Sequence, residues 1–196
     1  MTRRLPPTPQ LTPQLIVSAY AQGVFPMARG RNSDDVYFFS PDPRGVLPLD
    51  RFRIPRTVLR IVRQNRFEIR HDTAFEQVIA GCAAPREIDD GETWINAAIR
   101  EVFIELHALN FAHSIECWRD GVLAGGLYGV AIGGAFFGES MFHHPDPDIG
   151  THASNVALVA TVNHLIDRRF ELFDVQYTND HIERFGVIEI SREKYL

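Results

Sequence analysis

The stretch from Gly121 to Gly138, GVLAGGLYGVAIGGAFFG, contains eighteen residues without a charge, seven of them glycine. A transmembrane helix is one interpretation, because three glycines form the GxxxGxxxG pattern of membrane helix dimers. However, the run is short for spanning a bilayer, and its glycine content disfavours a helix. We interpret it as two buried strands joined by a turn at 131–134, since central strands have continuous apolar runs. We expect its glycines to let a ligand approach the backbone, and we expect no association with a membrane.

Outward from this stretch, the periodicity of apolar residues alternates between strand and helix patterns. Thr73 and Glu76 form a capping box that starts one of the helices. From residue 66 onward the predicted order is β-α-α-β-β-β-α-β, which indicates an α/β fold with a mixed sheet. Ligands often bind in such sheets where neighbouring strands diverge. The predicted strands cover 66–70, 112–118, 121–130, 133–138 and 171–175, and the main helices cover 74–82, 95–109 and 153–168, with a loop at 143–151.

The first third of the chain has a different character, with many Pro, Gly and Asp residues. Thr12 and Pro13 start a helix that Gly23 ends, and Pro55 opens a second helix that runs to about Gln64. We place a boundary near residues 63–66. The predicted organisation is a small N-terminal module with a basic face over 1–64 and a catalytic domain over 65–196.

Composition excludes several classes of protein. The 196 residues are 45% hydrophobic and 23% charged, which is typical of a packed globule and not of a disordered chain. The net charge of −5 disfavours a protein that coats nucleic acid. The two cysteines form no CxxC motif, so a thiolate zinc site or a disulfide scaffold is not expected. Prolines interrupt the N-terminus where a signal peptide needs an apolar run, and we expect a reducing, cytoplasmic compartment.

Within this acidic chain, one segment is strongly basic. Eight arginines lie between Arg44 and Arg70, opposed only by Asp50 and Glu68. Four of them are spaced by three, four and three residues, which places them on one face of a helix. The guanidinium group suits phosphate, so the segment favours contact with a nucleic-acid backbone, although a solvated helix face is the alternative. These four are Arg53, Arg56, Arg60 and Arg63.

Carboxylates at the ends of two apolar strands are the candidates for chemistry. Glu139 follows an apolar strand, and a buried carboxylate there needs a cation or donor such as a substrate amine. Asp174 and Gln176 stand two apart at a strand end, so we expect both on one face, where they could accept a proton and orient a nucleophile. The alternatives are a structurally satisfied Glu139 and a helix cap. The His- and Asp-rich segment 143–152 offers possible metal ligands, but its interleaved prolines favour a polar loop, and we expect no metal.

Several strings together resemble one family, the leucyl/phenylalanyl-tRNA–protein transferases. A single string would be weak evidence, but seven occur in the family's order over nearly the whole chain. They are Ala19-Tyr20 with Gly23–Pro26, then Ser40–Arg44, Gly91–Ile95, Ala112–Glu116, Gly125–Val130, Gly138–Phe142 and Asp174–Gln176.

The resemblance implies an acyl-CoA N-acyltransferase-like domain with an added N-terminal module. It implies transfer of Leu or Phe, with Met as a further candidate, from Leu-tRNA or Phe-tRNA to acceptor proteins that begin with Arg or Lys. The product would be an N-degron that directs bacterial proteolysis. The donor is an activated ester, so no cofactor, ATP or metal is expected, and positioning of the amine is a major contribution.

The resemblance also assigns roles to residues. Asp174 and Gln176 would orient the amine and assist its deprotonation, although the terminal ribose of the tRNA could take part instead. Tyr20 and Trp94 would pack near the terminal adenosine, where stacking contributes about 1–3 kcal/mol. The aminoacyl pocket would be formed by Leu127, Phe136, Glu139, Met141 and Leu158.

The chain departs from the family at several positions. Met27 stands where Trp is usual, Phe38-Phe39 replaces Trp-Trp, and Ser154-Asn155 replaces Ser-Lys. The changes at Met27 and Asn155 concern contacts to tRNA more than the type of reaction. Two rival hypotheses are an acyl-CoA-dependent N-acyltransferase of the same fold, whose pyrophosphate loop is not visible in the sequence, and a tRNA-binding protein without catalysis.

Overall fold

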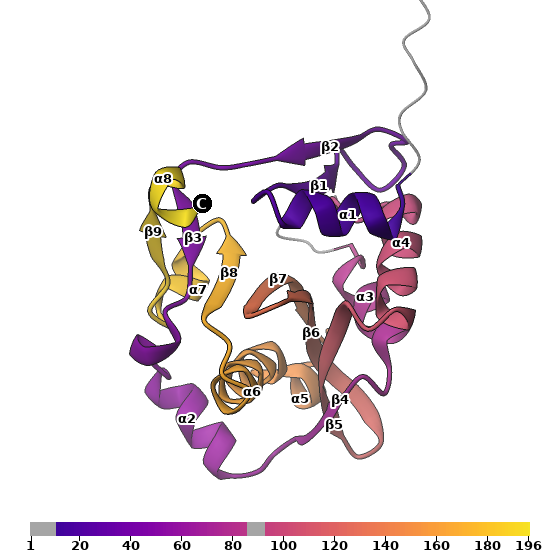
Figure 1. Ribbon diagram of the computed structural model, residues 1–196. Coiled ribbons are helices and arrows are strands. Elements are labelled where there is room, and N and C mark those ends of the chain that lie inside the picture. The colour runs from indigo at the N-terminus through magenta and orange to yellow at the C-terminus, as the bar shows by residue number, and fades with distance from the viewer. Residues whose placement is uncertain (1–10, 86–92) are drawn as a thin grey trace, which may run out of the picture.

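The computed structural model describes residues 11–85 and 93–196. Within them, seven strands form a mixed sheet in the order β4-β5-β6-β7-β8-β3-β9, and β1 and β2 form a separate antiparallel pair (Figure 1). The predicted α/β class with a mixed sheet is confirmed. The strands are β1 (Phe25–Ala28), β2 (Val36–Phe39), β3 (Arg44–Val46), β4 (Glu68–His71), β5 (Ala112–Arg119), β6 (Val122–Ile132), β7 (Ala135–His143), β8 (Leu172–Gln176) and β9 (Ile188–Ile190).

The glycine-rich apolar stretch forms the centre of the sheet. It folds into β6 and the first part of β7, which pair in antiparallel register around a turn with Gly133 at φ +58°. The predicted strands are therefore confirmed, and two of the glycines are required by close packing within the protein. A Cβ on Gly125 would lie 2.7 Å from Ala153 Cβ, and one on Gly129 would lie 2.4 Å from the Phe137 carbonyl oxygen. These glycines admit neighbouring protein segments.

Helices cover both faces of the sheet and bury two apolar cores (Figure 1). Successive residues of a strand point to opposite faces, so Phe136 enters the core beneath α6 while Phe137 enters the core beneath α1, α3 and α4. The helices are α1 (Pro13–Tyr20), α2 (Arg56–Arg63), α3 (Phe75–Cys82), α4 (Ala97–Ala108), α5 (Pro147–Gly150), α6 (Ala153–Asp167), α7 (Asp180–Glu183) and α8 (Arg192–Tyr195), with a 3₁₀ turn at Leu49–Arg51.

The crossover through α6 makes β7 and β8 parallel neighbours. Their pairing is short, because it joins residues 135–137 of β7 only to residues 172–174 of β8. Beyond that point β7 continues along β6, while β8 leaves it and pairs with β3. The two strands therefore diverge after Phe137 and Asp174, as was expected for a ligand-binding point of a mixed sheet.

The first third of the chain contributes to the same sheet. β3, which lies within residues 1–64, pairs with both β8 and β9. The helices predicted after Thr12 and Pro55 are confirmed as α1 and α2, and the Thr12 hydroxyl accepts a hydrogen bond from the Leu15 N–H as an N-cap.

Two local predictions are wrong. Thr73 does not cap α3, since its hydroxyl and its N–H both donate to the carboxylate of Glu116, as does the Ala74 N–H. A carboxylate from β5 thus replaces the local capping box at the helix start. The segment predicted as a loop at 143–151 begins with the last residue of β7 and contains the short helix α5. Among the described residues, no helix is long and apolar enough to cross a membrane.

Candidate functional site

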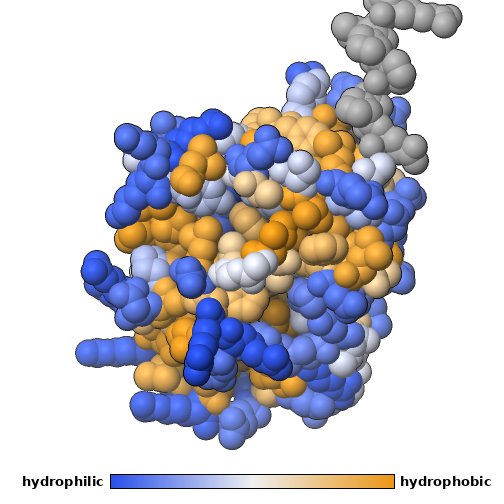
Figure 2. All heavy atoms as spheres, in the orientation of Figure 1, coloured by the Kyte–Doolittle hydropathy of each residue, from blue (hydrophilic) through white to orange (hydrophobic). Residues whose placement is uncertain are grey.

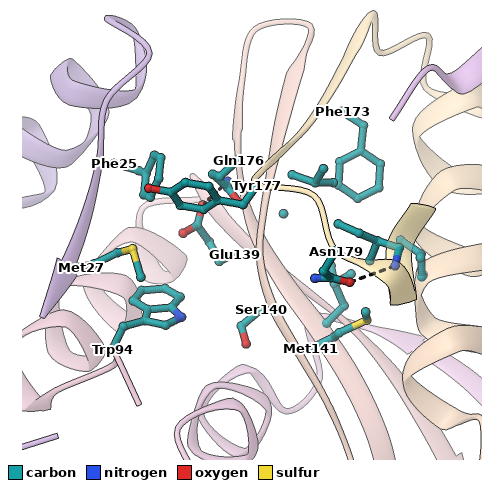
Figure 3. Close-up of a pocket in the computed structure, with 15 residues that line it drawn as sticks. Phe25, Met27, Trp94, Glu139, Ser140, Met141, Phe173, Gln176, Tyr177 and Asn179 are labelled. Carbon is teal, nitrogen blue, oxygen red and sulfur yellow. Dashed lines mark hydrogen bonds between the residues drawn. The ribbon is translucent and has the colours of Figure 1, made fainter. Parts of the chain in front are cut away.

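A cavity of about 260 Å³ opens where β7 and β8 diverge. Figure 3 shows Met27 and Trp94 together on one side, Met141 and Asn179 on the other, and Glu139 between them. β7, β8, the segment after β8, and β1 supply most of the wall. The lining residues are Phe25, Met27, Trp94, Leu127, Gly138, Glu139, Ser140, Met141, Leu158, Phe173, Val175, Gln176, Tyr177, Asn179 and Ile182.

Glu139 carries the carboxyl group among these lining residues. Burial is the main reason that its pKa is raised to about 8, and the negative charge of Asp174 adds to the shift, while Tyr20 and Arg44 oppose it. The Gln176 side-chain amide lies beside it, with Nε2 3.5 Å from Oε1. A carboxyl group with this pKa can exchange a proton with an amine near neutral pH, because an α-amino group titrates at about 7.7–8.0.

Of the predicted pair Asp174 and Gln176, only Gln176 lines the cavity. Asp174 is fully buried behind the cavity wall, where Arg44 is its main partner. Gln176 lines the cavity with its side chain beside Glu139, and its backbone has a left-handed φ of +60°. The Gln176 N–H donates to Asp174 Oδ1 at 2.8 Å, so the two residues are connected through the backbone.

The carboxylate of Asp174 already has several donors. Arg44 reaches it through Nε at 3.0 and 3.1 Å and through Nη2 at 2.6 Å, and the Tyr195 hydroxyl donates to Oδ2 at 2.6 Å. Together with the Gln176 N–H, these bonds use the acceptor capacity of both oxygens. Asp174 is therefore arranged to hold other groups in place.

The structure gathers most of the predicted aminoacyl pocket. Leu127, Met141 and Leu158 line the cavity together with Glu139. Phe136 does not join them: its ring packs on Phe173 with centroids 5.4 Å apart, and only Phe173 reaches the cavity. Phe136 therefore supports the wall from the core side.

The two aromatic residues predicted near an adenosine differ in exposure. Trp94 is half-buried and lines the cavity beside Met27, where a base could stack on it. Tyr20 is 2% exposed and packs on Phe137 with centroids 4.8 Å apart, so its ring is covered by the protein. Its hydroxyl has no hydrogen-bond partner of normal geometry among the described residues, but its proximity lowers the pKa of Glu139.

The predicted basic helix is present as α2, but Arg53 lies before its first residue, Arg56. Arg53, Arg56, Arg60 and Arg63 are all exposed, and we call them the α2 basic face. Hydrophilic side chains project in Figure 2 at the lower left, where Figure 1 places α2. The Arg53 N–H donates to the Phe185 carbonyl at 2.9 Å, which ties the start of this helix to the segment that carries Ile182 in the cavity wall.

Two arginines of the basic segment do not contribute to this face as free charges. Arg44 is 1% exposed and is paired with Asp174, and Arg70 forms a salt bridge with Glu68 at 2.8 Å. Across residues 11–85 and 93–196, no group of three or more His, Cys, Asp or Glu side chains is placed to hold a metal ion. Gly91 and Glu92 of the Gly91–Ile95 string lie outside the described residues.

Several site residues were missed in the sequence. Val175, Tyr177, Asn179 and Ile182 come from β8 and the segment that follows it. Their position directly after Asp174 is the signal that could have identified them, because residues beyond a diverging strand end surround the opening. No local signal identifies Arg44 and Tyr195 as partners of Asp174.

Family models and relatives agree on one family. The model "Leucyl/phenylalanyl-tRNA protein transferase" matches residues 46–196, and the model of that family's N-terminal domain matches residues 9–42. A leucyl/phenylalanyl-tRNA–protein transferase of Nitrobacter winogradskyi is 50% identical over 186 residues, which cover 95% of this chain and 80% of the relative. One from Akkermansia muciniphila is 47% identical over 187 residues, covering 95% and 93% of the two chains.

Among solved structures, FemX is similar in fold. The TM-score is 0.60 at 11% identity, over 90% of this chain and 66% of the other. At this identity the likeness concerns the fold alone, and it agrees with the predicted N-acyltransferase-like architecture.

Proposed function

From the premise that this chain belongs to the leucyl/phenylalanyl-tRNA–protein transferase family, we propose how its cavity performs the transfer. The chain is a transferase that moves an aminoacyl group from tRNA to a protein. In our proposal the donors are Leu-tRNA and Phe-tRNA, and the acceptors are proteins that begin with Arg or Lys. The product is an N-degron, made in the cytoplasm.

The aminoacyl side chain occupies the apolar part of the cavity. Leu127, Met141 and Leu158 contact it, and the flexible thioether of Met141 lets one pocket fit both Leu and Phe. Shape alone rejects β-branched Val and Ile, at roughly 1–3 kcal/mol for each misplaced group. Trp94 stacks on the terminal adenosine at the other side of the cavity, and the α2 basic face contacts the tRNA backbone.

The chemistry is the attack of an amine on an ester. The acceptor's α-ammonium first gives a proton to the Glu139 carboxylate, and the neutral nitrogen then attacks the carbonyl carbon of the aminoacyl ester. A C–N bond forms, the ester C–O bond breaks, and the ribose oxygen leaves with the second proton of the amine. No ATP is consumed, because the ester is already activated.

Gln176 orients the amine and keeps Glu139 in place, with its amide 3.5 Å from the carboxylate. Asp174 acts behind it, as a positioning residue that holds the Gln176 backbone. One observation carries this proposal: a carboxyl group with a pKa of about 8 and an amide converge on an apolar cavity at the point where β7 and β8 diverge.

A transfer assay tests the proposal. Purified protein is incubated with radiolabelled Leu-tRNA and a peptide that begins with Arg, and control peptides begin with Asp or with acetylated Arg. Label on the Arg peptide alone is the expected result. Label on the Asp peptide would overturn the acceptor rule, and no label on any peptide despite tRNA binding would overturn the catalytic assignment.

A second donor tests the rival hypothesis, in which the acyl group comes from acyl-CoA. The same Arg peptide is incubated with a labelled acyl-CoA in place of Leu-tRNA, and no transfer is expected. Efficient transfer from the acyl-CoA would favour the acyl-CoA-dependent alternative of the same fold.

A further inference from the structure

The last turn of the chain reaches the ion pair behind the cavity. The Tyr195 hydroxyl, in α8, donates to Asp174 Oδ2 at 2.6 Å. The same ring covers the guanidinium of Arg44, whose Cζ lies 4.7 Å from the ring centroid, and Phe25 lies 4.9 Å from that Cζ. Arg44 is thus in contact with two aromatic rings while its edge binds Asp174, an arrangement that stabilises a desolvated cation.

The arrangement joins segments that are distant in the sequence. Arg44 Nη1 donates to the Gly23 carbonyl at 2.8 Å, and Gly23, at φ +72°, lies so close to Tyr195 that a Cβ would approach its ring to 2.9 Å. Phe25, on one side of Arg44, also lines the cavity. The start of β1 and the end of β8 are therefore held together by Arg44 and Tyr195.

What this arrangement holds is the backbone of Gln176. The left-handed φ of +60° is unfavourable for an L-residue, and the bond from its N–H to Asp174 Oδ1 stabilises it. Tyr195 and Arg44 Nη2 bind mainly Oδ2, which fixes the carboxylate so that Oδ1 faces this N–H. If the carboxylate rotated, Gln176 would relax toward extended backbone and its amide would leave Glu139.

We propose that Tyr195 is a positioning residue for the transfer reaction, acting through Asp174 on Gln176. The inference rests on the function proposed above and adds a residue to it. Burial and the charge of Asp174 both raise the pKa of Tyr195, so the hydroxyl keeps its proton and continues to donate throughout the pH range of an assay.

The variant Tyr195→Phe removes the hydroxyl and keeps the ring over Arg44. We expect kcat for an Arg peptide to fall about ten- to hundredfold, since small displacements of catalytic groups have effects of this size. KM for the peptide and Kd for aminoacyl-tRNA stay within about twofold, because Tyr195 is not among the residues that line the cavity. Tyr37→Phe is the matched control: Tyr37 lies on β2 and is 43% exposed, and the change leaves kcat unaltered.

A double-mutant cycle with Gln176→Ala distinguishes positioning from general support of the fold. If Tyr195 acts through Gln176, then Tyr195→Phe causes no further loss in the Gln176→Ala background. An equal fold-loss in both backgrounds would overturn the proposal.

Hydrogen exchange of the Gln176 backbone N–H gives a readout that needs no turnover. Exchange becomes faster in Tyr195→Phe and is unchanged in Tyr37→Phe, whereas an unchanged Gln176 amide in Tyr195→Phe would overturn the proposal. Absence of transfer by the wild-type protein would instead contradict the proposed function, and exchange would still report whether Tyr195 holds Gln176.

Discussion

Arg44 and Asp174 are 130 residues apart in the sequence, yet their side chains form a buried ion pair with Nη2 2.6 Å from Oδ2. Both side chains are almost completely excluded from solvent. Such a pair offsets the cost of desolvation only when the geometry is good and the remaining acceptors are satisfied, as they are here by Tyr195 and the Gln176 N–H. The pair therefore links the stability of the fold to the geometry of the site.

Removing one charge should destabilise the protein strongly. Arg44→Met leaves Asp174 buried without its cation, and we expect the free energy of unfolding to fall by about 3–5 kcal/mol. Urea denaturation measures this change. Adding Asp174→Asn should recover part of the loss, because the buried charge is then removed; a double variant as unstable as Arg44→Met alone would contradict this explanation.

The pKa of Glu139 predicts a pH-dependent stability. Its value of about 8 in the folded protein lies above the ordinary 4.5, so the folded state binds the proton more tightly than the unfolded state does. The contribution of Glu139 to the free energy of unfolding is fully present below about pH 4.5 and is lost as the pH rises through about 8. Glu139→Gln stays neutral, so denaturation at about pH 9 should find it more stable than wild type, with a smaller difference at about pH 5. A difference that does not change with pH would contradict the assignment.

The hydroxyl of Tyr20 should set the pH profile of transfer. It lowers the pKa of Glu139, so Tyr20→Phe raises that pKa and moves the rising limb of kcat toward higher pH. Tyr128→Phe is the matched control, since the Tyr128 hydroxyl is also buried without a partner of normal geometry within the described chain but is not among the groups that lower the pKa of Glu139. Profiles of the two variants that move together would show that the effect is not specific to Tyr20.

Neutralising the α2 basic face should weaken tRNA binding through electrostatics. Replacing Arg56, Arg60 and Arg63 with Gln reduces the slope of log K against log salt by about 2–3, if each contacts one phosphate. Filter binding at several salt concentrations measures the slope. Arg100→Gln, an exposed substitution on α4, is the control that should leave it unchanged. An unaltered slope in the triple variant would remove this face from the tRNA site.

Placing the tryptophan that is usual in the family at position 27 should strengthen the binding of tRNA. Met27 lines the cavity beside Trp94, and Met27→Trp supplies the aromatic residue that is usual in the family at this position. We expect tighter binding of aminoacyl-tRNA, by about 1–3 kcal/mol if the new ring stacks on a base. Binding of an uncharged tRNA that lacks its 3′ adenosine should not improve; equal improvement for both tRNAs would show that the new ring contacts another part of the tRNA.

The elements with strong local patterns could be predicted from the sequence. The uncharged run from Gly121 to Gly138 gave adjacent central strands, and Thr12 and Pro55 marked helix starts, because alternation and capping depend on residues close in the chain. The carboxylate at the end of an apolar strand also pointed to Glu139 as a site residue. The ordered motifs identified the family before any contact was known.

Tertiary structure decided which side chains meet. Arg44 was counted only as part of the basic segment, but β3 inserts between β8 and β9 and brings it to Asp174. Asp174 and Gln176 were predicted to act together on the amine, but Arg44 and Tyr195 bind the Asp174 carboxylate, and only Gln176 lines the cavity. Thr73 binds Glu116 of another strand in place of its local partner. Local patterns report the spacing of apolar and capping residues along the chain. Contacts across the sheet depend on strand order and burial, which only the folded chain specifies.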